Sequence, residues 1–440
     1  MDAQTLTALL MFGAMLVLMA LRVPIWVAMF VPGAIGYAWL AGADTWLASL
    51  KGLVFARFSI YDLSVVPLFI LMGQFASAGG LSRALFRAAS ALVGHRRGGV
   101  AQASVIASAA FGAVCGSSVA TAATIGQVAL PEMKRVRYDP ALACATVAAG
   151  GTLGILIPPS VVLVIYAIVA EQNIAKLFAA ATIPGVIAMV GYLIAIGVYV
   201  RLFPGHAPEH DVDRPRMTLA GVLAVAPIAV IFTIVFGGIY GGLFTPTEGA
   251  GVGAAATFVA ALLRRELTLK KIAHCFYATA AASAMIFLIF IGADMMNTAL
   301  ALTQVPAQLA AVIQGWGVAP VLVVTGILLF YVVLGAVMDE LSMILLTIPI
   351  FFPVVMGLDF GMPKESVAIW FGIMVLMTVG FGLLAPPVGL NVYVVNGMAK
   401  NVPISESYRG VLPFLVSDVL RTALLLVFPP ISLWLVKFVG

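Results

Sequence analysis

Four clusters of helix-breaking or polar residues interrupt apolar stretches of the chain, and their atoms are of the types that bind small ions. The clusters are Gly116-Ser117-Ser118, Pro158-Pro159 with Ser160, Asp339-Glu340-Leu341-Ser342, and Pro386-Pro387 with Asn391. Because each proline lacks an N–H and clashes with the carbonyl one turn earlier, carbonyls in residues 150–155 and 378–383 should be partly freed. Freed carbonyls suit Na⁺. The helix N-termini beyond the breaks carry partial positive charge, which suits a carboxylate.

Hydroxyl groups around the breaks add neutral oxygen ligands. The candidates are Ser117, Ser118, Thr121, Thr152, Ser342 and Thr378. A simpler role competes with ion binding, because Ser117 and Ser118 could cap the helix that follows them, and Asp339 and Glu340 could cap theirs. Two acidic residues near the middle of a membrane are costly, however, which favours a role in cation binding or gating.

Other polar residues in apolar segments are expected to have structural roles. Asp294 and Asn297 should lie near the outer interface of the membrane and be solvated. Asp418 and Arg421 are three residues apart, so they could form an ion pair on one face of a helix. We therefore do not assign these four residues to an ion-binding site.

The composition indicates that the clusters lie in a membrane. Of 440 residues, 63% are hydrophobic and only 9% are charged, whereas soluble domains carry roughly a quarter charged residues. A chain this long and apolar cannot bury its surface in one water-soluble core. The net charge of +5 does not indicate nucleic-acid binding, because Lys and Arg occur in short clusters between apolar segments. The first apolar segment lacks the features of a cleaved signal peptide, so it should remain as a spanning helix.

Clusters of basic residues near helix ends favour the cytoplasm and thereby orient the chain. They comprise Arg83, Arg87, Arg96 and Arg97; Lys134, Arg135 and Arg137; Arg201, Arg214 and Arg216; Arg264, Arg265, Lys270 and Lys271; and Lys400 with Arg409. With a periplasmic N-terminus, all of them reach the cytoplasmic side if residues 100–131 form a re-entrant hairpin. Residues 320–355 then form a second hairpin that enters from the opposite side. This threading predicts about ten crossings besides the hairpins.

The two halves of the chain share an order of features that indicates an internal inverted repeat. Matching segments are PLFILMGQ at 67–74 with IFLIFIGA at 286–293, and GILIPP at 154–159 with GLLAPP at 382–387. Each half also has an amphipathic stretch before its hairpin, at 81–94 and at 302–315. Short matches between Gly-rich apolar segments can arise from composition alone, but the shared order and the charge distribution argue against this.

The sequence therefore predicts an all-α membrane protein with the inverted-repeat ion-transporter fold, two re-entrant helical hairpins and two broken helices. We expect N-terminal scaffold helices in residues 1–60 and linking helices in residues 204–268. The first repeat should occupy residues 61–203 and consist of a helix, an arm, a hairpin, a broken helix and a scaffold helix. The second repeat should occupy residues 269–440.

This arrangement favours ion-coupled transport of a small anion by alternating access. An intramembrane enzyme is disfavoured, because the four histidines fall in loops or at helix ends and no candidate base lies near Ser117. The three cysteines show neither metal-ligand spacing nor a disulfide framework. A channel is disfavoured, because two inverted hairpins fit a gated site at mid-membrane better than an open pore.

The most specific motifs of the chain are FGAVCGSSVATAATIG at 111–126, GGTLGILIPPS at 150–160, GAVMDELSMILLTIPIFFPV at 335–354 and GFGLLAPPVGLNVYV at 380–394. They resemble the large membrane subunit of tripartite ATP-independent periplasmic transporters, the dicarboxylate-type large permease, and the resemblance covers essentially the whole chain. It implies an elevator mechanism, in which a transport domain that holds both hairpins slides against a fixed scaffold. It also implies Na⁺ as the coupling ion, no organic cofactor, and a location in the bacterial inner membrane.

The resemblance further implies two Na⁺ sites, with the substrate between the hairpin tips. The first site would comprise Gly116, Ser117, Ser118, Thr152, Gly154 and Pro158. The second site would comprise Asp339, Glu340, Ser342, Thr378, Gly382 and Pro386. The substrate would be a C4-dicarboxylate, a sialic acid or a similar carboxylate. It would contact Ser117, Ser118, Thr121, Ser342 and Asn391.

Two partner proteins are implied as separate chains: a small four-helix membrane subunit, and a periplasmic binding protein that delivers the substrate. The nearest alternative is a stand-alone Na⁺-coupled dicarboxylate carrier, which would share the paired hairpins but need no partner. An intramembrane enzyme is a more distant alternative.

Overall fold

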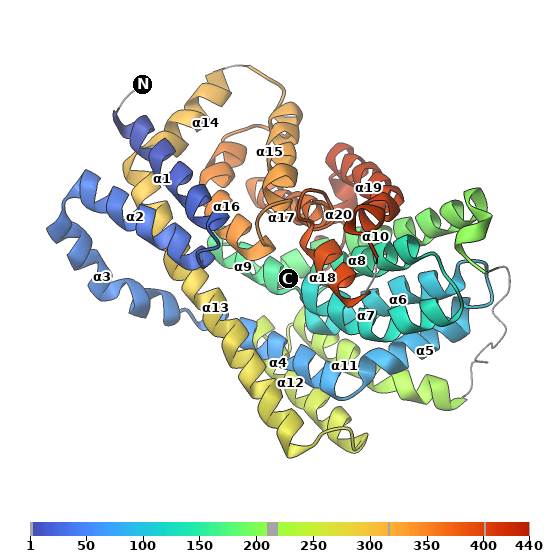
Figure 1. Ribbon diagram of the computed structural model, residues 1–440. Coiled ribbons are helices and arrows are strands. Elements are labelled where there is room, and N and C mark those ends of the chain that lie inside the picture. The colour runs from blue at the N-terminus through green and yellow to red at the C-terminus, as the bar shows by residue number, and fades with distance from the viewer. Residues whose placement is uncertain (1–2, 209–218, 316, 400–401, 440) are drawn as a thin grey trace.

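The breaks expected from the sequence separate helices of very different length. The computed structural model describes residues 3–208, 219–315, 317–399 and 402–439, which are helical apart from the connecting turns. Three members of the basic clusters, Arg214, Arg216 and Lys400, lie outside the described residues. Figure 1 shows how the helices are arranged.

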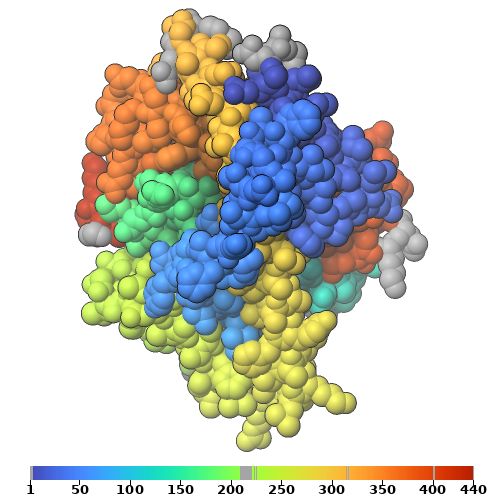
Figure 2. All heavy atoms as spheres, turned by 90° about the vertical axis from the view of Figure 1, so that its left-hand side faces the viewer, coloured from blue at the N-terminus to red at the C-terminus, as the bar shows by residue number. Residues whose placement is uncertain are grey.

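The chain begins with three helices, of which the second and third contact the long helix α13 (Leu269–Leu302) while the first packs against the second. They are α1 (Ala3–Ala20), α2 (Ile25–Ala41) and α3 (Ala43–Phe58). Helix α2 lies along α13, and α3 also contacts it. Figure 2 shows this face of the molecule, where the blue N-terminal helices partly cover the yellow α13. The sequence did not predict α3, because this helix has no buried residue and so no apolar face of its own.

The first half of the chain contains the first hairpin and the first broken helix. Its helices are α4 (Val65–Ala78), α5 (Leu81–Val93), α6 (Gly99–Cys115), α7 (Ser118–Arg135), α8 (Pro140–Leu156), α9 (Val161–Val169) and α10 (Ile174–Leu202). The chain breaks between α6 and α7 at the predicted tip, and between α8 and α9 at the predicted double proline, where the helix axis bends by 43°. Helices α11 (Leu219–Tyr240) and α12 (Pro246–Leu263) follow.

The second half repeats this order of helices after α13. Its further helices are α14 (Val305–Gly315), α15 (Pro320–Gly335), α16 (Glu340–Met356), α17 (Lys364–Gly382), α18 (Leu390–Met398), α19 (Ile404–Val427) and α20 (Pro430–Leu433). The breaks between α15 and α16 and between α17 and α18 again lie at the predicted positions. The amphipathic stretches of both halves are helices, α5 and α14, as predicted.

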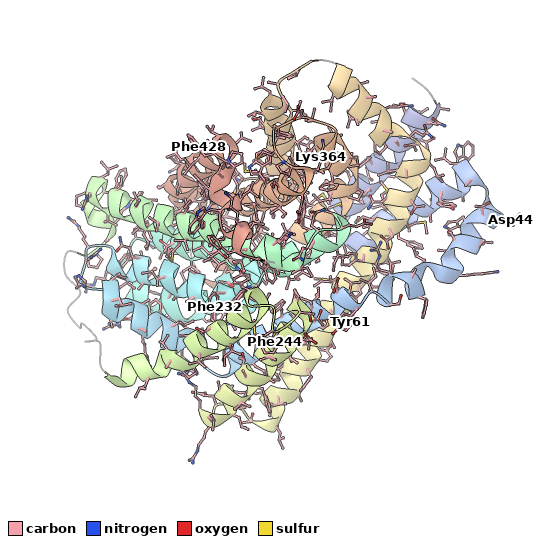
Figure 3. The ribbon with its side chains drawn as sticks, turned by 180° about the vertical axis from the view of Figure 1, so that it is seen from behind. Asp44, Tyr61, Phe232, Phe244, Lys364 and Phe428 are labelled. Carbon is pink, nitrogen blue, oxygen red and sulfur yellow. The ribbon has the colours of Figure 1, made fainter. Side chains whose placement is uncertain are left out.

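The helix lengths identify a multi-pass membrane protein. Seven helices of the described residues are long and apolar enough to cross a membrane, or eight if α8 and α9 form one bent span. The four hairpin helices have 16 to 18 residues, which is about 24–27 Å and less than a bilayer core of about 30 Å. Large apolar side chains such as Tyr61 and Phe428 lie exposed at the surface, 64% and 55% exposed (Figure 3), as expected for a surface that faces lipid.

Each hairpin packs against a broken helix through a pair of glycines. A β-carbon on Gly112 of α6 would lie 2.6 Å from the Cα of Gly154 of α8. In the second half, a β-carbon on Gly382 of α17 would lie 2.7 Å from the Cα of Gly335 of α15. Since a carbon atom cannot approach so closely, any side chain here would push the two backbones apart. The glycines therefore set how closely each hairpin approaches its broken helix.

Replacing Gly382 with Ala is expected to lower the stability of the protein by about 1–3 kcal/mol, because the added methyl group overfills this contact. Thermal unfolding of the purified protein measures the loss. Gly326→Ala in α15 is the matched control, since a β-carbon there meets no atom within 4 Å and alanine favours the helix. Equal melting temperatures for the two variants would contradict the close packing.

Candidate functional site

A cavity of about 790 Å³ lies between the two hairpin tips. Gly116 and Ser117 line it from the first tip, and Asp339 and Glu340 line it from the second. The remaining wall is mostly apolar. Most of it comes from α2, α4 and α13, with Trp26, Ile70, Gln74, Met285 and Ile289 among its residues, and α9 and α18 contribute smaller parts. The structure therefore brings together four of the predicted site residues around one space.

Both tips are shaped by ordinary helix-capping chemistry. Gly116 ends α6 with a φ of 66°, a left-handed conformation that glycine adopts without strain. Ser117 caps α7, where its Oγ accepts a hydrogen bond from the Ala120 N–H at 3.4 Å. Asp339 caps α16, where its Oδ2 accepts from the N–H groups of Leu341 and Ser342. The capping roles considered for Ser117 and Asp339 are confirmed.

Capping leaves other atoms of the second tip without partners. Asp339 Oδ1 is buried and has no hydrogen-bond partner among the described residues, and the same is true of Ser342 Oγ in the first turn of α16. Buried polar atoms normally have a hydrogen-bond partner, so two oxygens without one at the same tip are unusual. Both oxygens remain available to a ligand.

The two tips contact each other through Ser118 and Glu340. The Ser118 hydroxyl lies 3.1 Å from each carboxylate oxygen of Glu340 and donates its single hydrogen to them. Ser118 is fully buried, and Glu340 is only 7% exposed. The sequence assigned these residues to separate Na⁺ sites, whereas the structure places them in direct contact.

The two double prolines differ in the carbonyls they leave open. Each contains a cis peptide bond. At the first, the missing N–H groups of Pro158 and Pro159 deprive the carbonyls of Gly154 and Ile155 of their helical donors. At the second, the Leu383 carbonyl accepts from the Asn391 N–H at 3.1 Å.

The expectation that the Leu383 carbonyl is free is therefore wrong, because the chain turns back beyond Pro387 and supplies a substitute donor. The Gly382 carbonyl likewise accepts from the Ala385 N–H at 3.2 Å, although a carbonyl oxygen has a second lone pair. The first break is thus richer in free backbone oxygen than the second.

Oxygen atoms gather around Gly154 in the first half. A β-carbon on Gly154 would lie 2.5 Å from Thr121 Oγ1 and 2.6 Å from the Ser117 carbonyl oxygen. Thr121 is fully buried, and its hydroxyl has no hydrogen-bond partner among the described residues. A bare glycine, an unpaired hydroxyl and a nearby carbonyl oxygen form a setting that suits a small cation with oxygen ligands.

Asn391 joins this first cluster although it follows the second break. Its Nδ2 donates to the Ala148 carbonyl at 3.3 Å. A β-carbon on Gly151 would lie 3.0 Å from both Asn391 Nδ2 and the Ser118 carbonyl oxygen. Asn391 Oδ1 is buried and unpaired among the described residues. The side chain therefore links α18 to α8 and to the first hairpin.

Two predicted hydroxyl ligands are engaged elsewhere. Thr152 Oγ1 lies 3.0 Å from the Tyr192 hydroxyl of α10 and 2.8 Å from the Ala149 carbonyl. Thr378 Oγ1 donates to the carbonyl of Val375 within its own helix at 2.8 Å. Thr152 and Thr378 are thus bonded to a neighbouring helix or to backbone. Neither they nor the four prolines of the two double-proline breaks line the cavity.

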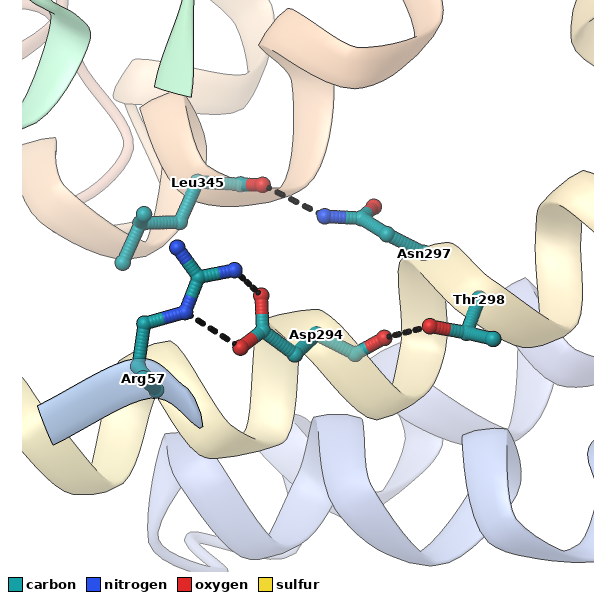
Figure 4. Close-up of polar contacts among 5 residues, drawn as sticks. All are labelled: Arg57, Asp294, Asn297, Thr298 and Leu345. Atoms are coloured by element: carbon teal, nitrogen blue, oxygen red, sulfur yellow. Dashed lines mark hydrogen bonds and ion pairs between the residues drawn. The ribbon is translucent and has the colours of Figure 1, made fainter. Parts of the chain in front are cut away.

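Asp294 and Asn297 are not solvated, contrary to the expectation from the sequence (Figure 4). Arg57 of α3 donates two hydrogen bonds to the Asp294 carboxylate, one of them from Nε at 2.6 Å. Asn297 Nδ2 donates to the Leu345 carbonyl of α16 at 3.0 Å. The expectation failed because α3, which the sequence did not predict, carries Arg57 against α13.

The predicted pair of Asp418 and Arg421 is confirmed as an ion pair by distance. Arg421 Nη2 lies 2.9 Å from Asp418 Oδ1, although the atoms are not aligned as a hydrogen bond. Gln74 is a residue that sequence reasoning missed: it lines the cavity from α4. Its signal was a single amide in the apolar run PLFILMGQ.

Comparison with known proteins assigns the chain to a family. Residues 12–431 match the model for the DctM component of tripartite ATP-independent periplasmic transporters. The C4-dicarboxylate TRAP transporter large permease protein DctM of Pseudomonas aeruginosa is 34% identical over 89% of this chain and 90% of its own. The sialic acid TRAP transporter large permease protein SiaM of Vibrio cholerae is 30% identical over 85% of this chain and 86% of its own.

A solved structure shows the same fold. The YdaH transporter of Alcanivorax borkumensis aligns with a TM-score of 0.64 at 16% identity, over 96% of this chain and 97% of that one. The resemblance found in the motifs is thereby confirmed. The chain belongs to the DctM-component family of tripartite ATP-independent periplasmic transporters, which are membrane permeases.

Proposed function

We propose that the chain is the membrane permease subunit of a secondary transporter in the bacterial inner membrane, which takes up a small organic acid with Na⁺. The names of its relatives support C4-dicarboxylates or sialic acids as substrates. The substrate would occupy the cavity of about 790 Å³ between the hairpin tips. The N-terminus would lie in the periplasm.

The charge of the cavity is the observation that carries this proposal. Its lining contains Asp339 and Glu340, but no Lys, Arg or His among the described residues. A carboxylate substrate that entered alone would meet two acidic groups in a partly dehydrated space, where like charges repel strongly. Bound cations would remove this repulsion. Substrate entry would therefore depend on prior cation binding, which is the basis of coupled transport.

The unpaired oxygens indicate where the cations would bind. In the first half they are the Thr121 hydroxyl and the Gly154 carbonyl, whose helical donor is missing at Pro158. The Ser117 carbonyl lies beside them; it accepts from the Thr121 N–H but keeps a second lone pair. In the second half they are Asp339 Oδ1 and Ser342 Oγ, with the Glu340 carboxylate beside them. Oxygen atoms of this kind suit Na⁺. The second group alone includes charged ligands, so we expect it to bind its cation more tightly.

We further propose that the two halves form an inverted repeat and that the hairpins and broken helices move as one group. Matching contacts support the repeat: the Val161 N–H donates to the Gly116 carbonyl, and the Val388 N–H donates to the Ala336 carbonyl. Helices α10 and α19 pack against α8 and α17. The sequence predicted α10 as a scaffold helix. These contacts instead favour placing α10 with the moving group.

The scaffold would comprise α1–α4 and α11–α13, and the cavity lies where it meets the tips. Sliding of the hairpins along this mostly apolar wall would carry the substrate across the membrane in an elevator mechanism. A small four-helix membrane subunit and a periplasmic binding protein would complete the transporter, as in the family to which the chain belongs.

Uptake into proteoliposomes tests the proposal. We expect accumulation of a labelled C4-dicarboxylate or sialic acid only when the small subunit, a loaded binding protein and an inward Na⁺ gradient are all present. Uptake by this chain alone would instead support a stand-alone carrier. Recovery of a chemically altered substrate would support an intramembrane enzyme. Uptake that ignores the Na⁺ gradient would refute the coupling.

A further inference from the structure

The carbonyl of Leu345 in the second hairpin forms its hydrogen bond across helices. In a regular helix this carbonyl would accept from the N–H of residue 349, but that residue is Pro349, inside α16. Asn297 of α13 takes the place of the missing donor, with its Nδ2 at 3.0 Å from the Leu345 oxygen (Figure 4). The proline thus creates an acceptor that only a neighbouring helix can satisfy.

The donor is held in place by a second contact one turn earlier on α13. Asp294 receives two hydrogen bonds from Arg57 of α3, and both side chains are mostly buried, at 17% and 25% exposed. A bidentate pair between Arg and a carboxylate fixes orientation as well as distance. Helix α13 is therefore fastened to α3 at the level where Asn297 reaches the hairpin.

We propose that Asn297 is a positioning residue, which seats the second hairpin against α13 by donating to the Leu345 carbonyl, and that this bond opens when the hairpin moves. The proposal rests on the proposed function, in which the hairpins move relative to α13. Hydrogen bonds within α16 travel with the hairpin and are the same in every conformation. The hydrogen bond from Asn297 exists only while the hairpin lies at its present position against α13.

The energetic consequence follows from the low dielectric of the membrane interior. A buried carbonyl without a donor is costly, more so where water cannot replace the lost partner. Departure of the hairpin from α13 leaves the Leu345 carbonyl bare until another donor is met. The contact therefore stabilises the present conformation relative to others, and it raises the barrier for leaving it.

A double-mutant cycle of Asn297→Ala and Pro349→Ala tests this assignment. Asn297→Ala should reduce the population of the present conformation on the order of tenfold, the scale of one hydrogen bond to an otherwise bare carbonyl. Pro349→Ala supplies an N–H inside α16, which satisfies the Leu345 carbonyl in every conformation. In that background, Asn297→Ala should change the population by no more than about twofold.

Pulsed electron paramagnetic resonance measures these populations in the complete transporter. Spin labels at Val54→Cys on α3 and Asp359→Cys, beyond α16, report the distance between scaffold and hairpin, since both positions are exposed. The three native cysteines are buried and form no disulfide bond, and they would be replaced by alanine. Na⁺-driven uptake by the variants is measured in parallel.

Pro353→Ala is the matched control, because it also removes a proline from α16 but its substitution adds no donor for Leu345. Asn297→Ala should keep its full effect in the Pro353→Ala background. An equal effect of Asn297→Ala in all backgrounds, or none in any, would overturn the assignment. Failure of the unmodified transporter to take up substrate would instead refute the proposed function, while the distance measurement would still test the contact.

Discussion

Replacing Glu340 with Gln is expected to raise the Na⁺ concentration for half-maximal uptake by roughly 10- to 100-fold. Gln has nearly the same volume as Glu and can still accept a hydrogen bond from Ser118, so the contact between the tips survives in part. The variant loses one of the two negative charges that line the cavity. An interaction with a charged group contributes about 1.5–3 kcal/mol. Loss of such a contribution to cation binding corresponds to the expected change of roughly 10- to 100-fold in Na⁺ concentration.

The matched control is Glu365→Gln, which also removes one negative charge. Glu365 is paired with Lys176 at 2.7 Å, but its side chain is 57% exposed, and exposed ion pairs contribute about 0–1 kcal/mol. Its Na⁺ dependence should equal that of the unmodified protein. Thermal stabilisation by Na⁺ in detergent gives a second readout if the Glu340 variant transports too slowly. An unchanged Na⁺ response in both assays would exclude Glu340 as a ligand.

The positions of the breaks were predictable because their causes are local. A double proline removes helical hydrogen-bond donors, and a Gly-Ser-Ser run favours a helix end, wherever the chain later packs. All four predicted breaks are present, and α7 and α16 begin at the predicted tips, at Ser118 and Glu340. Local sequence therefore determined where the non-helical backbone of the fold lies.

The directions of the side chains were not predictable in the same way. Thr152 and Thr121 looked alike as hydroxyls near a break, yet Thr152 bonds to Tyr192 of α10 while Thr121 stays unpaired beside Gly154. Successive side chains of a helix point in directions about 100° apart around the helix axis, so neighbouring residues face different partners. Which helix lies on each side is decided by tertiary packing.

Contacts between distant segments account for the remaining differences. Arg57 and Asp294 are 237 residues apart, and Asn391 reaches Ala148 across 243. Each of these contacts depends on a single polar side chain, which does not belong to any repeating pattern of apolar and polar residues in the sequence. The second cluster of carbonyls was misjudged for a similar reason, because the Asn391 N–H that binds Leu383 comes from beyond the break.

A second large effect is expected for the buried ion pair of α19. Asp418→Asn should lower the stability of the protein by about 3–5 kcal/mol, because it leaves the Arg421 charge buried without a counter-ion. Both side chains are nearly inaccessible, at 0% and 2% exposed. The Tyr192 hydroxyl donates to Asp418 at 3.1 Å, and the Arg421 guanidinium lies 5.7 Å from the centre of the Tyr192 ring. The variant therefore disturbs a network that extends to Thr152 of α8.

Glu132→Gln is the matched control, since Glu132 and Arg135 form an ion pair of the same spacing but with side chains 37% and 52% exposed. That substitution should cost no more than about 1 kcal/mol. Chemical unfolding of both variants in the same detergent measures the difference. Replacing Asp418 with Leu and Arg421 with Met together should recover much of the loss, because no unpaired charge then remains buried. Equal stability losses for Asp418→Asn and Glu132→Gln would mean that solvent reaches the buried pair. The charge of Arg421 would then not constrain the position at which the Tyr192 hydroxyl contacts Thr152 of α8.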